Sequence, residues 1–134
     1  MPITYQIDSE KGLIHTRCVG DVTLTDVVGH FRTLERDPEC PGRLDVLLDL
    51  SEMTSVPKSE EMRAASYEVS SVRSTVRFDH CAVVAVADAI FGMARMFAVF
   101  AEPWFAEILV FRERHEAEAW LSSRREQPTG SGSD

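Results

Sequence analysis

Seven consecutive apolar residues at positions 81–87 limit how this chain can fold more than any other feature. The run is too short to cross a membrane, because a transmembrane helix needs about 20 apolar residues. It is apolar on both faces and contains three valines, which is typical of a central strand in a parallel sheet. Since parallel strands are joined by crossover helices that cover the sheet, the run predicts an α/β fold.

Strand and helix patterns alternate on both sides of this run. Ile3, Tyr5 and Ile7 alternate with polar residues and predict a strand. A turn ending at Gly12 joins it to a second strand at residues 13–19, so the two form an antiparallel hairpin. The remaining predicted strands span residues 44–50, 81–87 and 108–111, and the helices follow Thr23, run from Met62 to Val76, and span residues 89–101 and 113–121. The order β-β-α-β-α-β-α-β-α indicates a mixed, mostly parallel sheet with an antiparallel N-terminal edge strand, covered by helices.

The length of the chain fits one domain. At 134 residues it can bury one core but not two. We expect a single domain over residues 1–123 and a disordered C-terminal tail over residues 124–134, where Gly and Ser replace apolar residues. Residues 1–12 lack the apolar core of a signal peptide, so we expect a cytoplasmic protein that is not integral to a membrane.

The charge balance argues against nucleic acid as a partner. The chain has 14 Lys and Arg against 22 Asp and Glu, a formal net charge of −8. A nucleic-acid binder needs cations that replace the counterions of the phosphates, and this chain would repel them. Three scattered cysteines without a Cys-x-x-Cys motif predict neither a disulfide framework nor a zinc site.

Catalytic motifs are missing from the sequence. It contains no His-Glu-x-x-His, no Gly-x-Ser-x-Gly and no Gly-rich phosphate loop. Asp49 and Asp88 each lie at the end of a predicted parallel strand, where carboxylates can hold Mg²⁺. The alternative is a structural role, with Asp88 capping the next helix, and we favour it because Asp is a common N-cap residue. We therefore expect no enzyme, no cofactor and no metal site.

The predicted helix at residues 89–101 is more apolar than a helix that covers a sheet needs to be. Ile90, Ala94 and Phe97 share the side that we assign to the sheet, which leaves an apolar surplus on the neighbouring side. That surplus is to be covered by a second copy of the chain, another protein or an apolar ligand, or else by the loop around Pro103. The candidate contact residues are Met93, Met96, Phe100, Phe91 and Trp104.

Several segments together resemble a known family. They are Ile-Thr-Tyr-Gln-Ile-Asp at 3–8, Leu-Leu-Asp-Leu-Ser at 47–51, Phe-Gly-Met-Ala-Arg-Met-Phe at 91–97, and Val-Phe at 110–111 followed by Ala-Glu-Ala-Trp-Leu at 117–121. In this order they resemble the SpoIIAA-like branch of the STAS (anti-sigma-factor-antagonist) family, which is also similar to the CRAL-TRIO (Sec14-type) domains. The resemblance covers residues 2–122.

The resemblance implies a regulatory module that is not an enzyme and that acts in bacterial signalling by binding a partner protein, with homodimerisation expected. Many STAS domains are phosphorylated near the start of the second helix, which makes Ser59, Ser55 and Thr54 the candidate phosphoacceptors here. For Ser59 the alternative is a helix N-cap. The CRAL-TRIO similarity implies a different function, in which the chain carries or senses a small apolar, lipid-like ligand beneath the third helix.

Overall fold

The computed structural model describes residues 2–72 and 76–126, and within them the chain forms a five-stranded sheet in the order β1-β2-β3-β4-β5. The strands are β1 (Ile3–Asp8), β2 (Leu13–Gly20), β3 (Arg43–Met53), β4 (Arg77–Val84) and β5 (Glu107–Phe111). The helices are α1 (Leu24–Glu35), α2 (Ser59–Ser71), α3 (Asp88–Ala101), the short 3-10 helix η1 (Glu102–Trp104) and α4 (Arg114–Glu126). β1 is antiparallel to β2 and the other pairings are parallel, which confirms the predicted fold class and element order.

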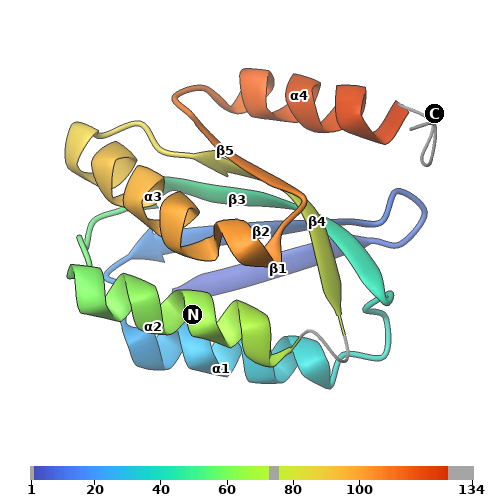
Figure 1. Cartoon of the computed structure of the whole chain (residues 1–134), viewed down its shortest axis with the longest axis horizontal. Coiled ribbons are helices and arrows are strands. Elements are labelled where there is room, and N and C mark those ends of the chain that lie inside the picture. The colour runs from blue at the N-terminus through green and yellow to red at the C-terminus, as the bar shows by residue number, and fades with distance from the viewer. Residues whose placement is uncertain (1, 73–75, 127–134) are drawn as a thin grey trace.

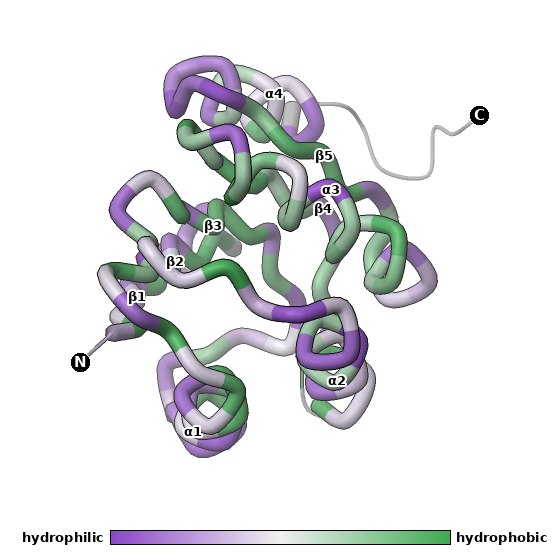
Figure 2. Tube along the Cα trace, turned by 90° about the vertical axis from the view of Figure 1, so that its left-hand side faces the viewer, coloured by the Kyte–Doolittle hydropathy of each residue, from purple (hydrophilic) through white to green (hydrophobic). Residues whose placement is uncertain are grey.

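The helices are divided unequally between the two faces of the sheet (Figure 1). α1, α2 and α3 cover one face, where their apolar residues join the larger core with Ile14, Val46 and Val83. α4 alone covers the other face, where Leu121 packs in a smaller core on Leu47. Figure 2 shows the same arrangement along the sheet, with α1 and α2 on the side opposite α4. Among the described residues, no helix has the length and apolar content needed to cross a bilayer.

Strand β4 differs from the predicted run at both ends. It begins at Arg77 and ends at Val84, whereas the sequence pattern placed it at residues 81–87. The apolar pattern does not predict this early start, because Asp79 and His80 are polar. Both are hydrogen-bonded to side chains of β3, Asp79 to Arg43 and His80 to Asp45. After Val84 the chain turns out of the sheet toward α3, so the last residues of the apolar run lie outside the strand.

Other element boundaries also shift. α2 ends at Ser71, whereas the sequence pattern predicted a helix that continues to Val76. The pattern misleads because Val72 and Val76 are buried in the core although they lie after the end of the helix. β3 continues three residues beyond Leu50 to Met53. α4 continues to Glu126, so Arg124 and Arg125 are helical rather than part of the predicted tail. The rest of that tail, residues 127–134, lies outside the described residues.

Replacing each of two glycines by alanine should change the stability of the fold in opposite directions. Gly12 closes the β1–β2 hairpin at a φ of 63°, a left-handed conformation that other residues adopt with strain. Gly29 lies in α1, and a Cβ built there meets no atom within 4 Å. We expect Gly12→Ala to lower the free energy of unfolding by about 1 kcal/mol and Gly29→Ala to raise it by up to about 1 kcal/mol. Urea unfolding of both variants measures this, and equal effects of the same sign would contradict it.

Candidate functional site

An apolar cavity lies between the sheet and the three helices α1, α2 and α3. Its volume is about 160 Å³. Strands β1 to β4 form its floor, and the helices and the loop after η1 form its roof and side walls. Representative lining residues are Ile14, Val46, Val69, Val83 and Ala94. The cavity therefore lies within the larger of the two cores.

Helix α1 forms one wall of the cavity while burying little of its own surface. Leu34 is its one buried residue, whereas Leu24, Val27 and Phe31 line the cavity and are only partly buried. The start of α1 is fixed by the predicted cap. The Thr23 hydroxyl accepts from the Asp26 N–H (3.2 Å), and the Asp26 carboxylate accepts from the Thr23 N–H (2.9 Å). α1 thus begins at a defined residue and is fully buried only at Leu34, near its C-terminal end.

Few polar side chains line the cavity. Thr16 on β2 is buried, and His30 on α1 is partly buried between the rings of Tyr5 and Phe31. Burial lowers the pKa of His30 from 6.5 to about 4, so the imidazole is neutral at pH 7. Burial also raises the pKa of the Cys18 thiol to about 12, so this lining group stays protonated. The interior of the cavity is therefore uncharged.

The cavity reaches the surface near the N-terminal ends of α1 and α2. Thr23, the cap of α1, and Glu61, in the first turn of α2, both line the cavity and are exposed. Pro57 lines the same end. The two helices lie side by side (Figure 1), and Arg32 of α1 donates to Glu68 of α2 (3.1 Å). The opening is thus framed by the segment that precedes α2.

The candidate phosphoacceptors lie beside this opening in different environments. The Ser55 hydroxyl accepts from the Val22 N–H (2.9 Å) and donates to the Val22 carbonyl (3.2 Å), so it ties the segment to the start of α1. Thr54 and Ser59 are exposed. The predicted cap at Ser59 is wrong, because the helix begins there and Lys58 is the N-cap residue, with its N–H donating to Glu61 (2.8 Å).

The predicted contact residues on and after α3 do not form one surface. Met93 is buried in the core and lines the cavity, so of the two predicted kinds of contact only one with an apolar ligand is open to it, and that contact stays a prediction. Met96 on the next turn is 43% exposed. Phe100 and Phe91 are partly buried, beneath the guanidinium groups of Arg63 (5.0 Å) and Arg112 (4.0 Å), and Trp104 packs against the core.

The two acids that were predicted at strand ends have structural partners. Asp49 is buried, and its carboxylate accepts from the Ser51 N–H (2.9 Å) and hydroxyl (2.6 Å). Asp88 is the first residue of α3 and bonds to Arg112 (2.7 Å). The predicted Asp88 cap is therefore wrong, because Ala87 occupies the N-cap position.

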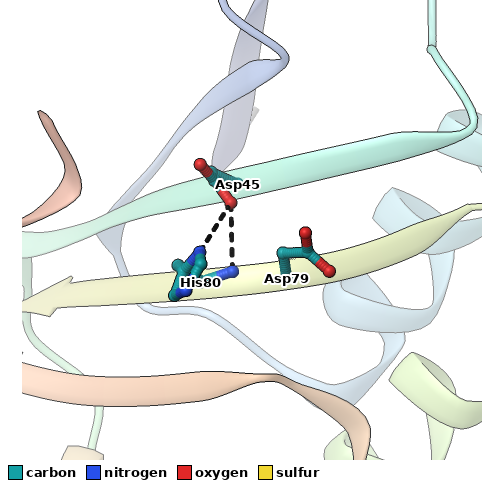
Figure 3. A group of neighbouring side chains, drawn as sticks. All are labelled: Asp45, Asp79 and His80. Atoms are coloured by element: carbon teal, nitrogen blue, oxygen red, sulfur yellow. Dashed lines mark hydrogen bonds and ion pairs between the residues drawn. The ribbon is translucent and has the colours of Figure 1, made fainter. Parts of the chain in front are cut away.

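Sequence reasoning missed a buried polar cluster on the α4 side of the sheet. Asp45 on β3 accepts from the backbone N–H of His80 on β4 (3.1 Å), and its carboxylate lies 3.3 Å from the His80 ring, with Asp79 alongside (Figure 3). The ligand atoms of these three side chains lie within 4.8 Å of one another, a spacing that a metal ion could use. Asp79 is already neutralised by Arg43 and Arg77, which favours a structural role. The signal that could have found this cluster is Asp45 inside the predicted buried strand at residues 44–50, because a buried carboxylate needs a partner.

A larger, polar hollow lies on the face that α4 leaves open. Its volume is about 960 Å³, and Arg17, Asp49 and Arg114 are among its lining residues. The charged groups pair with one another: Arg17 with Glu52, and Arg114 with Asp49 (3.7 Å). The hollow is thus lined by an ion-paired surface with no excess of one sign.

Comparison with known proteins agrees with this architecture. The SpoIIAA-like family model matches residues 13–122, and the chain belongs to this family. Its structure is similar to the crystal structure of an uncharacterized protein of the DUF3478 family with a SpoIIAA-like fold from Shewanella loihica PV-4. The two share 17% sequence identity and a TM-score of 0.57, over 89% of this chain and 91% of that one. No curated protein matches the chain. The similarity to CRAL-TRIO domains stays a prediction.

The cavity histidine predicts how stability depends on pH. The folded protein resists protonation of His30, whereas in the unfolded chain the imidazole has its ordinary pKa of 6.5. His30 therefore contributes full stability above pH 6.5, which is lost as the pH falls toward the folded-state value of about 4. Between about pH 7.5 and pH 5 we expect a loss of roughly 1–2 kcal/mol that His30→Phe removes. Urea unfolding at both pH values measures it, and an unchanged pH dependence in His30→Phe would contradict it.

The two serines near α2 predict different losses of stability. Ser55→Ala removes both hydrogen bonds to Val22, so we expect it to lower the free energy of unfolding by about 1–2 kcal/mol. Ser59 is exposed and is not the cap, so Ser59→Ala should change it by less than about 0.5 kcal/mol. Thermal and urea unfolding of the pair measure the difference. A larger loss for Ser59→Ala would show that Ser59 does cap the helix.

Proposed function

We propose that this chain is a non-enzymatic regulatory module of the STAS type that responds to a small apolar molecule bound in the cavity beneath α1, α2 and α3. The cavity volume of about 160 Å³ is the observation that carries the proposal. An empty apolar cavity costs about 24 cal/mol per Å³, which is about 4 kcal/mol for one of this size. Since a domain is stable by only about 5–15 kcal/mol, leaving this space empty uses a large part of that margin.

A bound apolar molecule would restore the lost contacts. It stabilises the folded state by mass action, because the unfolded chain has no cavity to bind it. The opening near Thr23 and Glu61 gives it a route that leaves the sheet intact. Leu34 is the one buried residue of α1. The position of this helix relative to the sheet therefore depends strongly on what fills the cavity. Occupancy of the cavity is thereby coupled to the position of α1, which a partner protein can contact from outside.

A second candidate function is direct binding of a protein partner, either another protein or a second copy of this chain. The outward side of α3 favours it, because Met96 and Val99 are 43% and 70% exposed on successive turns. The exposed Ser59 offers a phosphoacceptor at the start of α2 for such a module. In this role the chain acts in the bacterial cytoplasm on proteins rather than nucleic acid, in keeping with its net charge of −8.

Native mass spectrometry of freshly purified protein distinguishes the two candidates. The ligand proposal expects a small neutral molecule that leaves on gentle activation. The partner proposal expects a dimer without added mass, which Met96→Gln converts to a monomer. A monomer that carries no added mass and acquires none from the apolar probe described next would contradict both the ligand proposal and the homodimer.

Two adjacent alanines on α2 test the cavity directly. Ala65 lines the cavity, whereas Ala64 is partly buried elsewhere on the helix. Ala65→Leu fills part of the space, so we expect it to abolish binding of ethylbenzene, while Ala64→Leu leaves binding intact. The measurement is the ligand-induced rise in Tm, which should be several degrees for the wild type and Ala64→Leu at saturating ethylbenzene. Equal shifts in all three proteins would place the binding elsewhere, and no shift in the wild type would remove the proposal.

A further inference from the structure

One wall of the cavity is a row of rings that crosses from helix to sheet to loop. His30 and Phe31 on α1 lie 5.3 Å apart between ring centroids, Phe31 lies 6.2 Å from Phe78 on β4, and Phe78 lies 5.8 Å from Phe105 after η1. All four side chains line the cavity. Centroid separations of about 4.5–7 Å are those of attractive aromatic pairs. A ring placed in the cavity would therefore extend an existing aromatic row.

The polar groups of the wall favour a ligand with one hydrogen-bonding group. Among the described residues, His30 makes ring contacts but no hydrogen bond. Its neutral imidazole has one nitrogen that donates and one that accepts. A hydroxyl or N–H on the ligand would give this imidazole a hydrogen-bond partner inside the cavity. Thr16, across the cavity on the sheet, offers a hydroxyl as the alternative anchor.

Charge and volume narrow the ligand further. Among the described residues, no Lys or Arg lines the cavity, and the one acidic lining residue, Glu61, is exposed at the opening, where it repels anions. A buried carboxylate without a cationic partner would lose its hydration uncompensated, which excludes fatty acids and aromatic acids. The volume of about 160 Å³ is close to that of an engineered cavity of about 150 Å³ in another protein that takes benzene. This space fits one ring with a short substituent.

We infer that the cavity takes a small, neutral aromatic molecule with one hydroxyl or ring N–H group, and that His30 is the specificity-determining residue that hydrogen-bonds to that group. This inference rests on the proposed function and names its ligand class. It assigns to His30 a role that a purely structural aromatic residue in the same row would not have. The aromatic row supplies affinity for any such ring, and His30 supplies the preference for the polar substituent.

The test compares three probes of one shape by isothermal titration calorimetry at neutral pH: ethylbenzene, para-ethylphenol and para-ethylbenzoate. The wild type should bind para-ethylphenol about three- to tenfold more tightly than ethylbenzene, and para-ethylbenzoate not measurably. His30→Phe keeps a ring of similar size and should bind both neutral probes equally. His30→Gln keeps a donor and an acceptor and should retain part of the preference. Thr16→Val, the matched change on the opposite wall, should retain all of it.

The outcomes separate this inference from the proposed function. If none of the probes binds the wild type, both are overturned. If ethylbenzene binds but the preference for para-ethylphenol is absent, or survives in His30→Phe, the cavity is a binding site and the role of His30 is wrong. Loss of the preference in Thr16→Val with retention in His30→Phe would assign the hydrogen bond to Thr16 instead. Tight binding of para-ethylbenzoate would overturn the restriction to neutral ligands.

Discussion

The burial of β4 on both of its faces is the constraint on which the rest of the structure depends. Val83 and Val84 point to opposite faces of the sheet, and both are almost completely buried. A strand of this kind requires helices above and below it, and parallel crossovers supply them. The division is unequal, with three helices on one face and α4 on the other (Figure 1). The crowded face holds the large core and the cavity, whereas the other keeps an open, ion-paired hollow over β1 to β3.

The order of elements could be predicted from the sequence because it depends on local periodicity, which each segment carries by itself. The boundaries of elements whose end residues depend on partners far away in the sequence could not be predicted in this way. Asp79 and His80 belong to β4 because Arg43 and Asp45, about 35 residues earlier, neutralise and bond to them. The periodicity of apolar residues within one segment contains no information about such long-range pairs. The caps at Ser59 and Asp88 failed for a smaller reason, since each helix begins one residue earlier than its pattern indicates.

The candidate site was predictable only in part. The apolar surplus of α3 is present in the sequence, but the direction of each side chain depends on how the helix is rotated against its neighbours. Met93 faces the cavity, Met96 faces outward, and Phe100 lies beneath Arg63 of α2. The cavity itself depends on how far α1 stands from the sheet. That distance is a property of packing among four elements, and no single segment encodes it. In the sequence, His30 is one of four scattered histidines. Only the folded structure shows that its ring lies beside those of Phe31 and Tyr5.

The two candidate functions share one segment of the chain. A ligand shifts a conformational equilibrium only by its differential affinity for two states, so its effect must pass through elements that contact it. The segment of residues 53–61 contacts the cavity, and hence any ligand in it, at both of its ends. Met53 and Glu61 line the cavity, Ser55 ties the segment to the start of α1, and Ser59 is exposed. Filling the cavity constrains α1 and therefore this segment, while a charge placed on Ser59 acts on the same segment from outside. If the chain has both proposed functions, ligand binding and partner binding are linked through this segment, and by reciprocity each alters the affinity of the other.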